Sequence, residues 1–322
     1  MTQSSPKIVA VVVSFQPDIA VLLENLELIS KQVSQVVLVD NASPQQLAVL
    51  TRCQQVAAVM PQTSNRGLGA AHNIGIQYAK ALGATHVVIF DQDSRPREDM
   101  VANLYAAWSD LSQQNKVSAV GASYVSSHVD DADPDGQGDS CNRGSFFVRF
   151  GWLKFSREYC QARDDNTLDV GCQTIAADFL ISSGSLLAMD DLQEIGFMDE
   201  GLFIDHVDTE WFLRAKHKGF SAFGVCNALM EHGLGEKTRR VKLIRERNVP
   251  QHKPFRYYYI FRNSVLLYRR SYVSRKWLWN DLQRLLQIFV FYGLLYPPRW
   301  QNMRMMLKGI GHGMANKSGP LQ

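Results

Sequence analysis

The segment Thr85–Asp93, THVVIFDQD, places two carboxylates directly after an apolar run. Four consecutive apolar residues, Val87–Phe90, predict a strand that is covered on both faces. In open α/β sheets ligands bind beyond the carboxyl ends of the strands, so we expect Asp91 and Asp93 to project into a site. Two such carboxylates repel each other unless a cation lies between them, and Mg²⁺ or Mn²⁺ commonly takes one or two carboxylates with phosphate oxygens. Because this triplet also occurs on ordinary surface turns, its context must decide.

The surrounding pattern supports an α/β fold. Strand and helix patterns alternate along the first 120 residues, as in βα units that feed a mostly parallel sheet flanked by helices. Further strands are predicted at Ile8–Ser14, Val36–Asp40 and Val117–Ala122. Apolar residues at helical spacing from Ile19 to Ile29 predict an amphipathic helix, and a second helix is expected to begin with a capping box at Ser43.

Two further elements are expected beyond this region. Ala176–Met189 predicts a pair of strands with Gly184 in the middle. Val207–Lys218 predicts a helix that Gly219 ends, since glycine is the usual residue after a helix C-terminus.

Charge divides the 322 residues into two parts. Residues 1–236 hold 16 basic and 29 acidic residues, a net charge of −13, whereas residues 237–322 hold 18 and 2, a net charge of +16. We therefore predict a catalytic domain over 1–236 and a helical, basic and aromatic extension over 237–322, which faces an anionic partner. The five cysteines are scattered and never spaced as CxxC, so the sequence predicts no disulfide framework, no structural zinc site and a reducing cytosol.

The extension contains 14 aromatic residues interleaved with arginine. Its most apolar window, Trp277–Tyr296, is long enough for a helix but includes charged residues and is followed by Pro297, so a helix lying at a membrane interface suits it better than a transmembrane helix. Basic residues would add attraction to an anionic leaflet. The alternative is a helical subdomain whose aromatic side chains pack on the catalytic domain. A nucleic-acid partner is disfavoured because no nucleic-acid-binding motif accompanies the tail.

Two other segments suit a nucleotide ligand. Asp40 follows a strand end and could accept the imide N–H of uracil or thymine, although a helix-capping turn would also explain it. In Asn65–Gly75, NRGLGAAHNIG, small residues before a helix let backbone N–H groups approach a diphosphate, and Arg66 can neutralise part of its charge. The segment is no dinucleotide fingerprint, because His72 stands where GxGxxG requires glycine.

A fourth segment, Phe203–Arg214, FIDHVDTEWFLR, supplies a candidate base. Asp208 would lie in the first turn of a helix, where the helix dipole favours an ionised carboxylate, and could act as a general base. The acids of this segment could instead simply satisfy the helix N-terminus.

Together, in this order, the motifs resemble those of the family 2 glycosyltransferases, whose chains have a Rossmann-like GT-A fold. The similar segments are VVVSF, VDNAS, NRGLGAAHNIG, FDQD and FIDHVDTEWFLRA, and the resemblance covers roughly residues 7–235. The forms FDQDS, SSGSLL and FIDHVDTEW resemble those of bacterial rhamnosyltransferases that extend surface polysaccharides such as O-antigen.

The resemblance implies roles for individual residues. Asp208 would be the catalytic base, with Asp205 in support, because Val207 stands where the family commonly has an acid. Asp93 would bind the metal directly, and Asp91 would lie near the ribose and the metal. His232 would close the diphosphate site as a further metal ligand. The remaining implied substrate-binding residues are Ser14, Phe15, Asp40, Asn65, Arg66, Gly67, Asn73, Gly184 and Glu210.

The resemblance also implies a reaction. A Mg²⁺- or Mn²⁺-dependent, inverting transferase would move L-rhamnose from dTDP-L-rhamnose to a hydroxyl of a lipid-linked saccharide, in the cytoplasm and peripherally on the inner face of the cell membrane. A UDP-hexose donor and a non-catalytic sugar-binding or assembly protein are the alternatives. A nucleotidyltransferase is disfavoured because Ser14–Asp18 is not the glycine-rich, basic loop such an enzyme needs.

Overall fold

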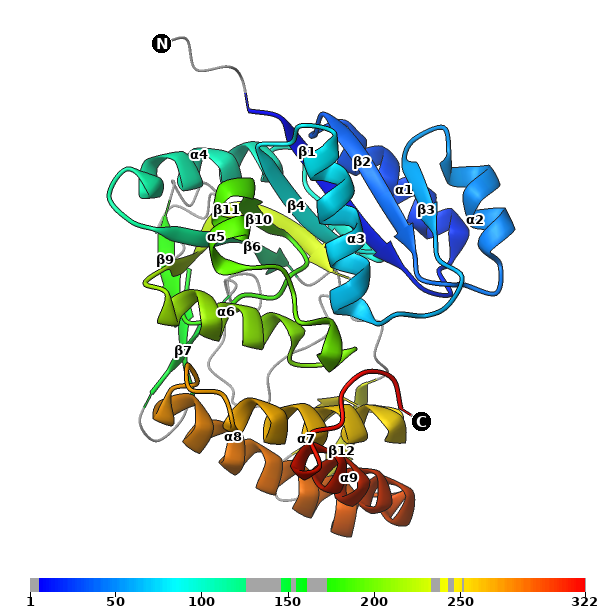
Figure 1. The fold of residues 1–322 in the computed structure, drawn as a ribbon, viewed down its shortest axis with the longest axis vertical. Helices are drawn as coiled ribbons and strands as arrows, with labels where there is room; N and C mark the ends of the chain where they lie inside the picture. The colour runs from blue at the N-terminus through cyan, green and yellow to red at the C-terminus, as the bar shows by residue number, and fades with distance from the viewer. Residues whose placement is uncertain are drawn as a thin grey trace.

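The computed structural model describes residues 6–125, 146–151, 155–160, 173–232, 238–242, 246–250 and 252–321. Its centre is a nine-stranded sheet in the order β3-β2-β1-β4-β10-β6-β11-β5, with β9 paired to β11 (Figure 1). The strands are β1 (Ile8–Ser14), β2 (Gln35–Asp40), β3 (Ala58–Pro61), β4 (His86–Asp91), β5 (Ser94–Pro96), β6 (Val117–Val125), β9 (Thr174–Ala177), β10 (Ser185–Ala188) and β11 (Ser221–His232). β3, β2, β1 and β4 are parallel, as is the β6–β11 pair, while β10 is antiparallel to β4 and β6. The predicted mostly parallel sheet is confirmed.

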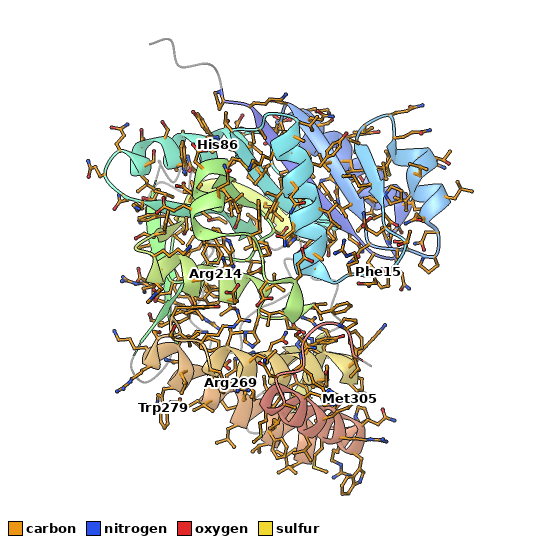
Figure 2. The ribbon with its side chains drawn as sticks, in the orientation of Figure 1. Phe15, His86, Arg214, Arg269, Trp279 and Met305 are labelled. Atoms are coloured by element: carbon orange, nitrogen blue, oxygen red, sulfur yellow. A yellow bond between two sulfur atoms is a disulfide. The ribbon has the colours of Figure 1, made fainter. Side chains whose placement is uncertain are left out.

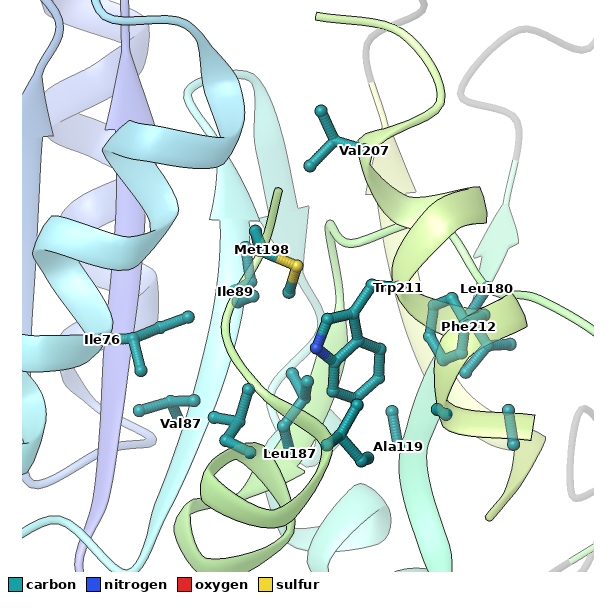
Figure 3. Packing of buried hydrophobic residues seen from close by; sticks show 14 of the residues in the cluster. Ile76, Val87, Ile89, Ala119, Leu180, Leu187, Met198, Val207, Trp211 and Phe212 are labelled. Atoms are coloured by element: carbon teal, nitrogen blue, oxygen red, sulfur yellow. The ribbon is translucent and has the colours of Figure 1, made fainter. Parts of the chain in front are cut away.

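Helices cover both faces of the sheet (Figure 1). One face carries α1 (Ile19–Ser30), α2 (Gln46–Cys53) and α4 (Met100–Ser112), and the other carries α3 (Leu68–Ala81), α5 (Met189–Ile195) and α6 (Val207–His217). Successive side chains of a strand point to opposite faces, so Val11 of β1 belongs to the α3 core and Val12 to the α1 core. Figure 3 shows Trp211 of α6 packed in the first of these cores, beside Leu187. Because both faces of the central strands are buried, these strands appear in the sequence as unbroken apolar runs.

Two local expectations were wrong. Helix α2 begins at Gln46 and has no side-chain cap, because the Ser43 hydroxyl donates to Asp40 Oδ1 at 2.6 Å instead. The strands in 176–189 form but do not pair with each other: β9 joins β11, and β10 joins β4 and β6. Between them Gly184 has φ +72°, and its N–H donates to the Ile89 carbonyl at 2.7 Å. Helix α6 ends before Gly219, at φ +85°, as predicted.

A disulfide joins Cys160 and Cys226, which corrects the expectation that the cysteines form none. The two residues are 66 positions apart in sequence, yet their Cα atoms lie 5.6 Å apart. Spacing along the chain could not reveal this pair, because the two cysteines meet only in the folded protein. Of the cysteines that the structure describes, Cys53 is free and buried.

The C-terminal part is a helical layer beneath the sheet domain (Figure 1). It comprises α7 (Pro254–Tyr268), α8 (Arg275–Ile288), the π-helical segment η2 (Phe289–Leu295) and α9 (Arg299–Met314). The remaining elements are the hairpins β7 (Phe146–Phe150)–β8 (Phe155–Tyr159) and β12 (Thr238–Lys242)–β13 (Glu246–Pro250), and the 3-10 turn η1 (Glu200–Leu202). Residues 257–264 of α7 are all buried: Tyr257, Ile260 and Phe261 pack within the extension, whereas Asn263 contacts the catalytic domain at Leu202. Across the described residues, we find no helix with the length and apolarity needed to span a bilayer.

Candidate active site

The polar strand ends predicted from the sequence meet at one edge of the sheet. Ser14 is in register with Asp40, and Val13 is in register with Asp91. Burial, together with the charges of Asp208 and Asp93, raises the pKa of Asp91 to about 7. The two acids of the DxD motif, Asp91 and Asp93, and the candidate base Asp208 are therefore close enough for the charge of one to shift the pKa of another.

Asp208 is held by one serine. The Ser182 hydroxyl donates a short hydrogen bond to Asp208 Oδ1, and the Ser182 backbone N–H donates to Oδ2 at 3.2 Å. Burial raises the pKa of Asp208, while the two bonds from Ser182 lower it and the charge of Asp205 raises it. The net direction is upward, which makes this carboxylate a stronger base than an exposed aspartate.

The Ser182–Ser183 segment, which connects Asp208 to Asp91, was not predicted from the sequence as part of the site. Ser183 Oγ accepts from the Asp91 N–H at 3.0 Å and lies 2.6 Å from Ser94 Oγ. The Ser183 carbonyl accepts from the Tyr124 hydroxyl at 2.6 Å. Burial raises the pKa of this tyrosine well above its usual value, and the charges of Asp91 and Asp208 act in the same direction. The motif SSGSLL, which begins at Ser182, was the available sign that these serines lie at the site.

Asp40 is fully buried and its carboxylate has several partners. Oδ1 accepts from the hydroxyls of Ser14, at 3.1 Å, and Ser43. Oδ2 accepts from the Ser43 N–H at 3.0 Å and from Gln46 Nε2 at 3.1 Å. These bonds hold the turn that follows β2, and contact with a nucleotide base stays a prediction. Next to this turn, the Phe15 N–H donates to Gln92 Oε1 at 2.8 Å, which ties the first strand to the DxD motif.

The side-chain amide of Asn41, in the segment VDNAS, organises the Asn65–Gly67 loop. Asn41 Nδ2 donates to Asn65 Oδ1 at 3.1 Å, and Asn41 Oδ1 accepts from the Arg66 N–H at 2.9 Å. The half-exposed Arg66 guanidinium lies 3.5 Å from Glu200. Gly67 has φ +86°, and a Cβ there would lie 2.4 Å from the carbonyl oxygen of Phe203, so only glycine fits.

Three predicted substrate-binding residues make contacts within the protein. Asn73 exchanges two hydrogen bonds of 2.9 Å with the backbone of Met198. Asp205 pairs with Arg256 of α7 at 2.6 Å. Glu210 is 0% exposed and binds three side chains. Those partners of Glu210 are Arg214 at 2.8 Å, Arg270 at 3.2 Å and the Tyr272 hydroxyl.

Glu210 is therefore not retained as a substrate-binding residue. It lies two positions after Asp208, and a helix turns about 100° per residue, so the two acids point to different sides of α6. Its guanidinium partner Arg214 also donates to the carbonyls of Ile195 and Phe197, at 2.8 and 2.7 Å. Through Glu210, Arg214 and Arg270, this network joins α6 to the segment that follows α7. Figure 2 shows Arg214 in the part of the catalytic domain above the C-terminal helices.

The residues fit a divalent cation held by few protein ligands. No group of three or more His, Cys, Asp and Glu side chains within the described part of the chain is arranged to hold a metal. The side chain of His232 lies outside the described residues, while its backbone pairs with Ser94, next to Asp93. The half-buried, mutually repelling carboxylates of Asp91 and Asp93 match the one or two protein ligands with which Mg²⁺ or Mn²⁺ completes a shell of phosphate and water oxygens.

A separate cavity of about 300 Å³ opens elsewhere on the domain. Its lining includes Arg149, Lys216 and Phe220 and none of the predicted site residues. Ser118 and Ser221, which also line it, lie at the amino ends of β6 and β11, so this cavity is at the sheet edge opposite Asp91.

Comparison with known proteins gives one family. Residues 10–177 match the model of glycosyl transferase family 2. The dTDP-rhamnosyl transferase RfbF of Shigella flexneri is 30% identical over 266 residues, which cover 83% of this chain and 81% of that protein.

Solved structures share the fold. S. aureus TarS in complex with UDP-GlcNAc superimposes with a TM-score of 0.54 at 14% identity, covering 96% of this chain and 80% of that one. GalNAc-T7 with UDP, GalNAc and Mn²⁺ gives 0.55 at 14% identity and 89% of this chain. This chain covers only 56% of the GalNAc-T7 chain, and at such identities the likeness concerns the fold alone.

Proposed function

The chain belongs to glycosyl transferase family 2, and on that premise we propose that it transfers L-rhamnose from dTDP-L-rhamnose to a hydroxyl of a saccharide acceptor. The observation that carries the choice of sugar is the 30% identity to a dTDP-rhamnosyl transferase over 83% of the chain. We further propose that the acceptor is a lipid-linked saccharide of O-antigen or another surface polysaccharide.

In the proposed reaction Asp208 is the general base. Its carboxylate takes the proton of the acceptor hydroxyl while the hydroxyl oxygen attacks the anomeric carbon from the face opposite the nucleoside diphosphate. The bond from that carbon to the diphosphate oxygen breaks, the oxygen leaves with the electron pair, and the configuration inverts. Ser182 orients the base by its two hydrogen bonds.

The other site residues bind and orient the donor in this proposal. Asp93 and Asp91 would hold Mg²⁺ or Mn²⁺, with His232 as the further candidate ligand, and the cation would supply positive charge beside the leaving diphosphate. Ser14, Phe15 and Asp40 would form the base pocket. Asn65, Arg66, Gly67 and Gly184 would shape the diphosphate side, with Asp205 supporting the base from the α6 loop.

The proposal is tested by release of nucleoside diphosphate. Purified protein is supplied with dTDP- and UDP-sugars and Mg²⁺ or Mn²⁺, and the wild type is compared with Asp93→Ala and Asp208→Asn. Asp110→Asn, an exposed acid on α4, is the matched control. We expect selective turnover of dTDP-L-rhamnose that both site variants lose and the control keeps. Turnover of a UDP-hexose instead would replace the donor assignment. Absence of turnover with every donor, even with membrane lipid extract as the acceptor source, would overturn the proposed activity.

A membrane partner is proposed for the extension 237–322. The outer surface of α8, η2 and α9 exposes large apolar side chains, and Figure 2 shows Trp279 at the edge of this layer. The exposed apolar residues are Trp279, Leu282, Leu286, Val290, Leu294, Leu295, Trp300, Leu307 and Met314. Exposed Arg275, Arg299 and Arg304 accompany them, and the only acid of α8 to α9, Asp281, is buried against Arg284. Tryptophan with arginine and no exposed carboxylate suits an anionic leaflet.

Vesicle sedimentation tests this partner. We expect the protein to bind vesicles that contain phosphatidylglycerol and to leave neutral phosphatidylcholine vesicles in the supernatant. The double variant Trp300→Ser, Leu286→Ser should lose binding, whereas Leu47→Ser, an equally exposed apolar residue on α2 of the catalytic domain, should retain it. Equal loss in both variants would contradict a docking face on the extension.

A further inference from the structure

The loop before helix α6 has an unfavourable backbone. Phe203, Asp205 and His206 have φ values of 66°, 63° and 63°, although none of them is glycine. Such a conformation is unfavourable for a residue that has a side chain and persists only where surrounding contacts hold it. The His206 carbonyl accepts the Glu210 N–H at 2.9 Å and so closes the first turn of α6, which contains Asp208. The position of Asp208 therefore depends on what holds this loop.

One side chain of helix α7 contacts the loop backbone at three points. Asn263 Nδ2 lies 2.9, 2.8 and 2.9 Å from the carbonyl oxygens of Leu202, Ile204 and Asp205. Its two N–H groups are shared among these three acceptors. Asn263 is 0% exposed, so no water can replace these bonds.

The same helix contributes two arginines. Arg262, also 0% exposed, donates to the Leu202 carbonyl at 2.8 Å and to Asn263 Oδ1 at 2.9 Å, which fixes the orientation of the asparagine amide. Arg256 pairs with the Asp205 carboxylate at 2.6 Å, about two helical turns before Asn263. Backbone and side chain of the loop are thus both held from α7.

Helix α8 holds the last residue of the loop. Arg284 lies 2.9 Å from His206 Nε2 and, because a guanidinium can only donate, this ring nitrogen must accept. Arg284 is itself oriented by the buried Asp281 carboxylate at 2.6 Å. Every partner named here, on α7 and α8, belongs to the C-terminal extension.

We propose that Asn263, supported by Arg256, is a positioning residue for catalysis: the C-terminal extension holds the strained 203–206 loop and thereby places the Asp208 carboxylate. The inference rests on the proposed function, in which Asp208 is the base. It gives the extension a second role besides membrane contact, because its inner helices complete the active site.

The test compares variants within α7. Asn263→Ala removes the loop contacts. Tyr258→Phe, its matched control, removes a partly buried hydrogen bond of the same helix to His312 of α9 and leaves the loop contacts in place. We expect Asn263→Ala to lower kcat for sugar transfer about a hundredfold, the scale for a misplaced catalytic group, with the donor KM changed less than about threefold. Tyr258→Phe should keep kcat within about twofold.

A second pair of variants tests the same role in case Asn263→Ala does not fold. Arg256 is partly exposed, so Arg256→Met should fold and lower kcat about tenfold, and Arg256→Lys, which retains the charge facing Asp205, should recover most of that loss. Wild-type kcat in both Asn263→Ala and Arg256→Met, or an equal loss in Tyr258→Phe, would overturn the proposal.

Hydrogen–deuterium exchange separates this inference from the proposed function. The Glu210 amide reports whether the first turn of α6 is closed, independently of any donor. Faster exchange over 203–210 in Asn263→Ala, but not in Tyr258→Phe, is expected even if the wild type were to turn over no sugar, in which case the proposed function alone would fail. Unchanged exchange in Asn263→Ala would refute the loop-holding role.

Discussion

Substitution of Ser182 by alanine tests how the base is tuned. The Ser182 hydroxyl donates to the Asp208 carboxylate and lowers its pKa, while burial raises it. Ser182→Ala removes this donor and leaves the backbone N–H at 3.2 Å in place. A hydrogen bond to a charged group contributes about 1.5–3 kcal/mol, and the lower figure applies because one donor remains. That energy corresponds to about a tenfold change in the ratio of protonated to ionised carboxyl.

The sign of the effect follows from which form the bond stabilises. Because the hydroxyl stabilises the ionised form, its loss raises the pKa of Asp208 and leaves less active base at acidic pH. We expect kcat/KM for nucleoside diphosphate release to fall about tenfold on the acid limb, with a smaller change on the alkaline plateau.

The assay is a pH–rate profile from pH 5 to 9 for wild type, Ser182→Ala and Ser185→Ala. Ser185 is a matched control, because it is a buried serine of the same segment whose hydroxyl donates to the Ile181 carbonyl at 2.7 Å. An acid limb that stays in place in Ser182→Ala, or that moves equally in Ser185→Ala, would refute the assignment of Asp208 as a base tuned by Ser182.

Three further predictions concern stability, each measured by urea unfolding. Gly67→Ala should lower the free energy of unfolding by about 3 kcal/mol, since a Cβ at φ +86° meets the Phe203 backbone at 2.4 Å; a loss below about 1 kcal/mol would show that the loop adjusts. His72 is buried without a hydrogen-bond partner and burial lowers its pKa from 6.5 to about 4, so the stability present above pH 6.5 is lost as the pH falls towards 4. About 2 kcal/mol of that loss at pH 5 should vanish in His72→Leu, and an unchanged pH dependence would contradict it. Reduction of the Cys160–Cys226 disulfide should cost roughly 2–4 kcal/mol, whereas equal stability with and without reductant would argue against the bond.

Much of the architecture could be predicted because its determinants are local. The strand Ile8–Ser14 forms as predicted, since a run of β-branched residues suits a strand buried on both faces. Both Asp40 and Asp91 were predicted at strand ends, and because parallel strands end at one edge of the sheet, both lie at that edge. The sequence did not show that the Ser43 hydroxyl donates to the Asp40 carboxylate and does not cap helix α2, because the same local pattern is compatible with either hydrogen bond.

By itself, the sequence determined the fold class, the sheet edge that carries the candidate site and the acids that lie at that edge, because strand periodicity and strand ends are properties of short segments. Only the tertiary structure decided which partner each polar side chain takes. Asp205 lies beside Arg256 and Asn263, more than 50 residues further along the chain, and Glu210 turns away from Asp208 into an ion network with Arg270. Such pairs are fixed by how the C-terminal helices pack on the catalytic domain, and packing between distant segments leaves no spacing in the sequence from which it could be inferred.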